Sequence, residues 1–154
     1  MEVELTTMCC LIDKKRQCVL MIDRKNSWKG RAFPGGHLEE GEAITDCVIR
    51  EMKEETGLDL ISVQYKGNTY FYNTDNCKKH IIWNFLCDEF TGQLKQQCDE
   101  GTLEWVELDK IREGNLAEGM ELRFDLFLQP GVFELYVEWN KKDGYTNVRK
   151  ILIS

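Results

Sequence analysis

Hydrophobic and polar residues alternate near the start of the chain in a pattern typical of β-strands. Two strands are predicted, Glu4–Asp13 and Cys18–Arg24, and the polar turn Asp13–Arg16 joins them. The polar and basic residues Asn26–Arg31 indicate a loop. Ala32–Pro34 is expected to be extended, because a proline ring restricts the residue before it to β-type backbone angles.

The clearest helix is predicted for Ala43–Thr56. Four apolar residues recur there at helical spacing: Ile44, Cys47, Val48 and Met52. Gly57 follows as a stop signal, because glycine readily adopts the left-handed conformation that ends many helices. The pattern therefore predicts a helix with one apolar face.

The second half of the chain predicts two β-hairpins with shorter elements between them. Val63–Asn73 and Ile81–Phe90 are β-type runs, and the polar turn Thr74–Lys79 favours their antiparallel pairing. Asp143 and Gly144 form a strong turn signal near the end of the chain. The other predicted elements are a strand at Leu103–Val106, helices at Leu108–Ile111 and Gly119–Leu128, and hairpin strands at Val132–Trp139 and Tyr145–Ile153. Strands interspersed with few helices favour an α/β fold, a sandwich in which helices cover a mixed β-sheet.

Length and composition favour one globular domain that spans residues 1–154. A domain of 154 residues buries roughly 70% of its extended-chain surface, and 42% hydrophobic and 31% charged residues are ordinary values for such a domain. No apolar run approaches the roughly 20 residues of a membrane-spanning helix. The acidic segment Met1–Glu4 lacks the basic start of a secretory signal. We therefore expect a cytoplasmic protein with no membrane partner.

Charge and cysteine usage argue against two further classes of protein. The net charge of −7, without a basic run, disfavours binding to duplex nucleic acid but allows a small phosphorylated substrate neutralised by a bound cation. Seven scattered cysteines without a Cys-x-x-Cys pair predict buried reduced thiols rather than a disulfide or zinc framework. Cys77 and His80 lack a second pair of ligands, so zinc is not expected there.

Three acidic residues converge on one face of the predicted helix: Glu51, Glu54 and Glu55. Two of them occupy positions that the helical period assigns to the apolar side. Like charges at this spacing repel by about 0.2–0.5 kcal/mol per exposed pair, and by more when they are partly buried. A solvated helix end is one interpretation of this cluster. The alternative interpretation is a site for a divalent metal ion.

Three features favour the metal site over the solvated end. The acids lie in the C-terminal half of the helix, where the helix dipole disfavours anions, and only Arg50 offers them a cation at helical spacing. The glycines before the helix, Gly35 and Gly36, would let a backbone carbonyl approach the same point. Carboxylate and carbonyl oxygens are the ligands that Mg²⁺ and Mn²⁺ accept.

The spacing of these residues follows one continuous pattern. It reads Gly, any five, Glu, any seven, Arg-Glu, apolar, any, Glu-Glu, any, Gly, apolar, at positions Gly36, Glu42, Arg50, Glu51, Met52, Glu54, Glu55, Gly57 and Leu58. This pattern resembles the Nudix box, the signature of hydrolases that cleave a nucleoside diphosphate linked to another group. The order of the flanking strands is also similar to that of Nudix domains, which implies a Nudix-type α/β/α sandwich.

The resemblance implies a role for each residue of the box. Divalent cations, Mg²⁺ or Mn²⁺, would be bound by Glu51, Glu54 and Glu55 with the backbone carbonyl of Gly35. Four residues would shape the box, with Arg50 bonded to a neighbouring carboxylate: Gly36, Glu42, Arg50 and Gly57. Glu100 is a further candidate for metal ligand or general base, and an exposed loop glutamate is the alternative. The catalytic proton acceptor would be one of three carboxylates: Glu51, Glu54 or Glu100.

The resemblance also implies candidates for substrate binding. Arg24 occupies a position where MutT-type members carry an arginine that faces phosphate, and Arg31 is a weaker candidate of the same kind. Phe33 and Phe71 would stack on a base, or else belong to the core. Asn115 is a candidate for hydrogen bonds to the base, and so is Glu118.

Three segments are similar to the MutT and 8-oxo-dGTP diphosphatase branch of the family: Ala32–Gly36, His80–Phe85 and Leu103–Leu108. ADP-ribose hydrolases carry a proline a short distance after the box, whereas this chain has none between Pro34 and Pro130. Asn115–Met120 lacks the tryptophan and paired aspartates of the mammalian-type purine pocket.

The resemblance thus predicts Mg²⁺-dependent hydrolysis of nucleoside triphosphates, such as the oxidised nucleotide 8-oxo-dGTP, to monophosphate and pyrophosphate, by a monomer or homodimer. ADP-ribose, dinucleoside polyphosphates and RNA 5′ ends are alternative substrates. A non-catalytic nucleotide sensor is the remaining alternative, and the complete set of box glutamates favours catalysis over it.

Overall fold

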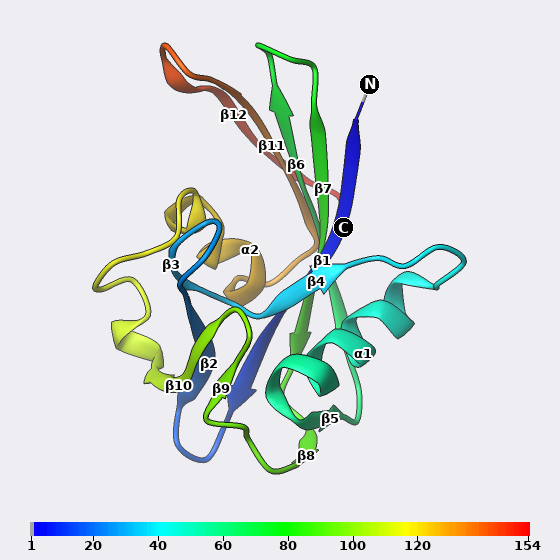
Figure 1. Ribbon diagram of the computed structural model, residues 1–154, viewed down its shortest axis with the longest axis vertical. Helices are drawn as coiled ribbons and strands as arrows, with labels where there is room; N and C mark the ends of the chain where they lie inside the picture. The colour runs from blue at the N-terminus through cyan, green and yellow to red at the C-terminus, as the bar shows by residue number, and fades with distance from the viewer. Residues whose placement is uncertain (1) are drawn as a thin grey trace.

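The computed structural model describes residues 2–154, and a mixed sheet of ten strands forms its centre (Figure 1). The strands follow the order β12-β11-β6-β7-β1-β2-β10-β9, while β3 pairs with β2 and β4 pairs with β1. Their bounds are β1 Val3–Asp13, β2 Cys18–Arg24, β3 Gly30–Ala32, β4 Gly35–His37, β6 Gln64–Asn73, β7 Lys79–Cys87, β9 Gln97–Cys98, β10 Gly101–Glu107, β11 Phe133–Asn140 and β12 Gly144–Leu152. Two more strands, β5 Leu58–Leu60 and β8 Phe90–Gly92, pair with each other.

Strand β1 connects the two halves of this sheet. It runs parallel to β7 along most of its length, and β11 runs parallel to β6, whereas the other pairings are antiparallel. On its other side β1 pairs with β4 at Thr6–Met8 but with β2 only at Ile12 and Asp13. The two halves therefore diverge, and β6, β7, β11 and β12 rise away from β2 and β10 in Figure 1. Residues from both halves line the cleft described below.

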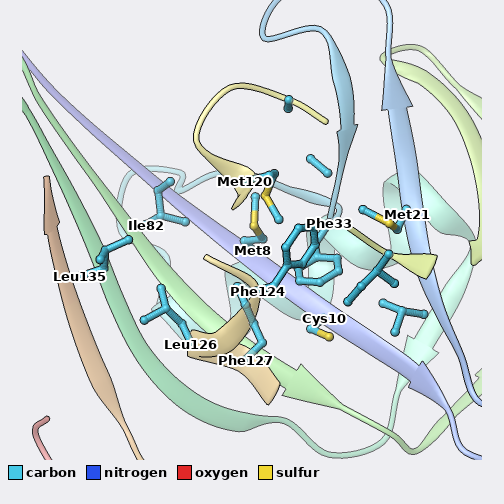
Figure 2. Packing of buried hydrophobic residues seen from close by; sticks show 14 of the residues in the cluster. Met8, Cys10, Met21, Phe33, Ile82, Met120, Phe124, Leu126, Phe127 and Leu135 are labelled. Carbon is cyan, nitrogen blue, oxygen red and sulfur yellow. The ribbon is translucent and has the colours of Figure 1, made fainter. Parts of the chain in front are cut away.

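One helix covers each face of the sheet, so the chain forms an α/β/α sandwich. Alternate residues of β1 enter two separate cores. Cys9 and Leu11 pack with residues of helix α1 (Ile44–Thr56), and Met8 and Cys10 pack with residues of the short helix α2 (Phe124–Leu128). Figure 2 shows the second core, where the rings of Phe33, Phe124 and Phe127 lie together. The predicted fold class is confirmed.

The long predicted strands and the first helix are present with bounds close to those expected. Both predicted hairpins form antiparallel pairs, β6 with β7 and β11 with β12. The prediction of one strand at Ile81–Phe90 was wrong at its end, because β7 stops at Cys87 and β8 starts at Phe90 to pair with β5.

The predicted helix at Gly119–Leu128 is interrupted. A 3₁₀ turn covers Met120–Leu122, Arg123 caps it with a φ of −113°, and α2 begins only at Phe124. The buried Arg123 explains the interruption, since its side chain donates hydrogen bonds to Asn84 and Thr69 on the sheet. Leu108–Lys110 is also a 3₁₀ turn rather than an α-helix.

The cysteines all carry free thiols, and four of them are buried: Cys9, Cys10, Cys47 and Cys87. Cys77 is exposed. Between residues 2 and 154, no helix has the length and apolar character needed to cross a bilayer.

Candidate active site

Helix α1 brings the box residues beside the glycines of β4. The helix ends where Gly57 takes a φ of 83° and its N–H bonds to the Lys53 carbonyl at 3.0 Å. Its inward face carries the apolar Val48 and Met52, and two turns after Val48 that face carries Glu55, which is only 8% exposed. A carboxylate therefore occupies a position that the packing of the helix would otherwise give to an apolar side chain.

Arg50 organises the acids at the outer side of this helix. Its Nε donates to Glu42 at 2.6 Å, and its Nη1 donates to Glu51 at 2.8 Å and to Glu54 at 3.1 Å. Its Nη2 also donates to the backbone carbonyl of His37 at 3.0 Å, which ties the helix to β4. These hydrogen bonds from Arg50 lower the pKa of Glu42 to about 2. Glu42 and Arg50 thus form a fixed pair around which Glu51 and Glu54 are arranged.

Glu55 lies in the opposite situation, since it is buried among other acids. The backbone N–H of Gly35 donates to its Oε2 at 3.2 Å. Burial raises the pKa of Glu55 to about 9, and the carboxylates of Glu100 and Glu51 raise it further in the same direction. Burial also raises the pKa of Glu51, against the effect of Arg50. Negative charge at this point is therefore not compensated by the side chains around it.

The residues of this region fit a divalent cation. Gly36 leaves the space that the Glu51 carboxylate fills, because a Cβ at Gly36 would overlap that carboxylate. The available donors are carboxylate and carbonyl oxygens, the hard ligands of Mg²⁺ and Mn²⁺. Within residues 2–154, no three acidic, histidine or cysteine side chains already surround one point as ligands. Arg50 and Arg24 hold the carboxylates of Glu51 and Glu100 in the arrangement described here.

A cleft of about 630 Å³ opens beside Gly35, Gly36 and Glu100. This volume lies within the range of roughly 300–1,000 Å³ that is usual for small-molecule sites. The lining comes from β1, β4, β6, β7, the β2–β3 loop and the β11–β12 hairpin. Glu100 lines this cleft together with Gly35 and Gly36, the glycines that lie against Glu55 and Glu51, and the lining also contains several aromatic residues.

Arg24 and Trp28 form the wall of the cleft on the β2 side. Arg24 donates from Nη1 to Glu100 at 2.9 Å, and its guanidinium lies 5.6 Å from the centre of the Trp28 ring. Trp28 has a φ of 51°, which is unusual for a bulky residue, and its indole N–H donates to the Glu118 carbonyl at 2.8 Å. Its ring is thus held in place from two sides, and a strained backbone kept by such contacts is typical of functional sites.

Some residues predicted to bind substrate lie in the cleft, and others do not. Arg24 and Phe71 line it. Phe33 borders it but is 1% exposed, and its ring packs edge-on against Phe124 and Phe127 at 5.6 and 5.0 Å, so it is a core residue.

Arg31 and Asn115 lie outside the cleft lining. The Arg31 guanidinium bonds to the Glu113 carbonyl at 2.9 Å and lies 3.3 Å from the Glu104 carboxylate. Asn115 is exposed, and its backbone carbonyl accepts a hydrogen bond from the Arg31 N–H. Neither residue is among those that line the cleft, because the Arg31 side chain bonds to Glu113 and Glu104, and their role as substrate contacts stays a prediction.

Six aromatic residues of the lining were not predicted as site residues: Trp28, His37, Tyr72, His80, Trp139 and Tyr145. Trp28 lies in the polar and basic loop Asn26–Arg31, where the charged residues were considered as substrate contacts and the tryptophan was not. His80 lies in the segment that resembles MutT and donates or accepts a hydrogen bond with Thr6 at 2.9 Å. Trp139 and Tyr145 belong to the predicted C-terminal hairpin, whose position beside β6 has no local signal in the sequence.

The sandwich fold, with the carboxylates of α1 beside the glycines of β4 that border this cleft, is that of a hydrolase acting on nucleoside diphosphate-linked substrates. Residues 3–127 match the sequence model of the NUDIX domain, and the chain belongs to the Nudix hydrolase family, which acts on nucleoside diphosphate-linked substrates. The uncharacterized Nudix hydrolase YvcI of Bacillus subtilis is 34% identical over 116 residues, which cover 73% of this chain and 72% of that protein.

Other relatives carry different activities in their names. The 8-oxo-dGTP diphosphatase of Buchnera aphidicola is 33% identical over 112 residues, or 68% of this chain and 78% of that protein. The ADP-ribose pyrophosphatase of Methanocaldococcus jannaschii is 33% identical over 103 residues, or 66% of this chain and 60% of that protein. Among solved structures, the MutT protein of Bacillus halodurans matches with a TM-score of 0.82 at 25% identity, over 96% of this chain and 97% of that chain. Nudix hydrolases as a family generally use divalent cations.

Proposed function

We propose that this Nudix hydrolase is a Mg²⁺-dependent pyrophosphohydrolase of purine nucleoside triphosphates, including oxidised forms such as 8-oxo-dGTP. The observation that carries the proposal is the buried Glu55, which faces Glu100 and Glu51 at the end of an aromatic cleft. A buried acid without a cation is unfavourable, and a divalent ion bound together with the polyphosphate would supply the missing positive charge. The similarity to a relative named 8-oxo-dGTP diphosphatase supports the substrate class.

The metal ligands in this proposal are the carboxylates of Glu51, Glu54, Glu55 and Glu100 with the Gly35 carbonyl. A bound Mg²⁺ or Mn²⁺ would neutralise phosphate charge and lower the pKa of a bound water. Arg24 would face a phosphate oxygen from the β2 side of the cleft, where its guanidinium is already positioned by Trp28.

The reaction adds water to the phosphoanhydride and yields nucleoside monophosphate and pyrophosphate. The oxygen of water forms a bond to phosphorus, the bond from phosphorus to the bridging oxygen breaks, and pyrophosphate leaves. A carboxylate accepts the proton of the attacking water, and Glu51, Glu54 and Glu100 are the candidates. No side chain has to form a covalent intermediate, which agrees with a cleft whose polyphosphate end offers carboxylates and arginine.

The other end of the cleft fits a flat aromatic base. Trp28 and Phe71 stand on different walls, and π-stacking between such rings and a base stabilises binding. Burial lowers the pKa of His80 to about 4, so this imidazole is neutral at pH 7 and presents no charge to the base. The Glu118 carboxylate lines the same end and is an acceptor for N–H groups of a guanine edge.

The second candidate substrate is ADP-ribose, which the relative named ADP-ribose pyrophosphatase favours. A panel of 8-oxo-dGTP, ordinary dNTPs, ADP-ribose, dinucleoside polyphosphates and 5′-triphosphate RNA, each with Mg²⁺, separates the candidates by kcat/KM. We expect a purine triphosphate to be hydrolysed best and pyrophosphate to be the leaving product.

The proposed metal role has a direct test in Glu54→Gln. Glu54 is exposed and its loss leaves the core intact, so the variant is expected to keep its melting temperature and lose Mg²⁺-dependent pyrophosphate release. Glu113→Gln, an exposed acid far from the box in sequence, is the matched control. Full activity of Glu54→Gln would refute the assignment, and so would a nucleotide that binds wild type without being hydrolysed.

A further inference from the structure

The C-terminal hairpin lies outside the region that matches the NUDIX domain, yet it builds part of the cleft. The match ends at residue 127, and β11 and β12 follow it at Phe133–Asn140 and Gly144–Leu152. Strand β11 pairs in parallel with β6 from Phe133 opposite Gly67 to Trp139 opposite Asn73. The hairpin therefore extends the wall that β6 and β7 form, as Figure 1 shows by the four strands that rise together.

Trp139 faces the cleft because side chains along β11 alternate between the two faces of the sheet. Leu135 and Val137 are buried in the core on the α2 side, and Trp139 continues this face at the next alternate position. Tyr136 and Glu138 point to the other face, where the Tyr136 hydroxyl donates to the Glu138 carboxylate at 3.0 Å. The strand therefore has one face toward the cleft and one away from it.

A β-bulge then places Tyr145 beside Trp139. The register between β11 and β12 shifts after Glu138, which pairs with Asn147, so that Trp139 pairs with Tyr145 and Thr146 is passed over. Such a bulge changes which side chain faces a site. Both aromatic residues of this pair line the cleft.

Tyr145 also connects the hairpin with the opposite wall. Its hydroxyl lies so close to Gly119 that a Cβ there would stand 2.9 Å from it, and the Phe71 ring lies alongside. Burial raises the pKa of Tyr145 to about 12, and the nearby Glu118 carboxylate acts in the same direction, so the phenol remains a proton donor. The Glu118 carbonyl in turn holds the indole of Trp28. Tyr145 and Trp28 thus both lie next to Glu118.

We propose that Trp139 and Tyr145 are specificity-determining residues that complete the base end of the cleft and select a large flat base, a purine. This inference rests on the proposed function and adds which part of the chain reads the base. The indole of Trp139 offers a face for stacking, and the Tyr145 hydroxyl, which lies beside Gly119 next to Glu118, offers a hydrogen-bond donor in the same lining. The polyphosphate, which the acids and Arg24 hold, does not reach these two side chains in this arrangement.

The test compares a substrate that has a base with one that lacks it. Steady-state kinetics with dGTP and with 2-deoxyribose 5-triphosphate are measured for wild type, Trp139→Ala, Trp139→Phe and Tyr145→Phe. Loss of one stacking ring is expected to raise KM for dGTP about tenfold in Trp139→Ala, with kcat little changed. KM for the base-free triphosphate stays at the wild-type value. Trp139→Phe, which keeps a ring, recovers most of the loss and shows that the hairpin is folded.

Tyr136→Phe is the matched control for Tyr145→Phe, because each removes one hydroxyl that neighbours a glutamate, on opposite faces of the same hairpin. Tyr145→Phe is expected to raise KM for dGTP several-fold and to reduce the preference for dGTP over dTTP, whereas Tyr136→Phe does neither. Equal changes for base-containing and base-free substrates, or no change at all, overturn the inference while the proposed function stands.

A wild-type protein that hydrolyses none of these triphosphates overturns the proposed function instead. The hairpin is then judged by binding of dGMP, followed by the quenching of tryptophan fluorescence in wild type and Trp139→Phe and by calorimetry in Trp139→Ala. Weaker binding in Trp139→Ala supports the inference, and equal affinity of Trp139→Ala and wild type overturns it.

Discussion

The Arg24 guanidinium donates a hydrogen bond to the Glu100 carboxylate across a distance of 2.9 Å between Nη1 and Oε2. This contact joins the two functional parts of the cleft, since Arg24 also lies over the Trp28 ring and Glu100 lies against the buried Glu55. A cation and an acid that both face the same polyphosphate are thus paired with each other in the protein alone.

Replacing Arg24 by alanine is expected to weaken substrate binding more than folding. The pair is partly exposed, with 19% and 45% of the two side chains accessible, so its loss changes stability by about 1 kcal/mol or less. Loss of a charge-assisted contact to phosphate should raise KM for a triphosphate about tenfold. Arg16→Ala is the control, because Arg16 also pairs with an acid and stacks on an aromatic ring, that of Trp105, but does not line the cleft. Equal kinetics of Arg24→Ala and wild type would contradict a phosphate contact.

Glu55→Gln is expected to stabilise the metal-free protein and to inactivate the enzyme. The glutamine is neutral at every pH and can accept the same hydrogen bond from Gly35, so folding no longer has to protonate a buried acid whose pKa is raised to about 9. We expect the free energy of unfolding at pH 8 with EDTA to rise by about 1–2 kcal/mol, a few degrees in Tm. Mg²⁺ should raise the Tm of wild type and not that of the variant. A metal-free variant that melts below wild type would show that the Glu55 charge is compensated in the fold.

The two neighbouring glycines of β4 are expected to respond differently to alanine. A Cβ at Gly35 would overlap the backbone carbonyl of Thr7 on β1, which cannot move without breaking the sheet, so Gly35→Ala should unfold at a clearly lower temperature. A Cβ at Gly36 would overlap only the carboxylate of Glu51, the far end of a flexible side chain. Gly36→Ala should therefore fold with nearly the wild-type Tm and lose most Mg²⁺-dependent activity. Thermal melting and pyrophosphate release of both variants check this, and an active Gly36→Ala would contradict the role of Glu51.

The sequence predicted those features of the structure that depend on residues close together along the chain. The apolar spacing from Ile44 to Met52 and the stop at Gly57 predicted helix α1 because a helix brings residues three and four apart to one face. Glu42 lies in the loop directly before this helix, and Arg50 on the helix donates to it at 2.6 Å. The acidic end of the cleft was predictable for this reason.

The aromatic part of the cleft depends on pairing between strands that lie far apart in the sequence. Arg24 and Arg31 are both basic residues near the same loop, yet β2 turns one into the cleft while β3 turns the other toward Glu113. Phe33 and Phe71 are both aromatic, and only tertiary packing decides that Phe33 is covered by α2. Trp139 enters the cleft because β11 pairs with β6, and the sequence contains no local signal for that pairing.

His80 is a half-buried imidazole at the edge of the cleft, and its surroundings keep it neutral. Burial is the main cause that lowers its pKa to about 4, although Glu4 opposes this shift. Arg123 and Lys78 are the cations that face it, from the segment before α2 and from the turn before β7, and the His37 ring on β4 is also near. Its ring forms a hydrogen bond with Thr6 at 2.9 Å, so the neutral ring is tied to β1.

The free energy of unfolding should therefore decrease as the pH falls from about 6.5 to 4.5. The substitution His80→Gln should make this decrease smaller. The folded pKa of His80, about 4, is below that of an unfolded histidine, about 6.5, so the unfolded chain takes up a proton first as the pH falls. The stabilisation is complete above pH 6.5 and is lost toward pH 4, by about 1 kcal/mol after allowance for the partial exposure of the ring. Glu55 acts with the opposite sign, but equally in both proteins, so the measured quantity is the difference between their Tm values at pH 7.5 and pH 5. Parallel melting curves of wild type and His80→Gln across this range would show that the ring is protonated equally well in the folded and unfolded chains.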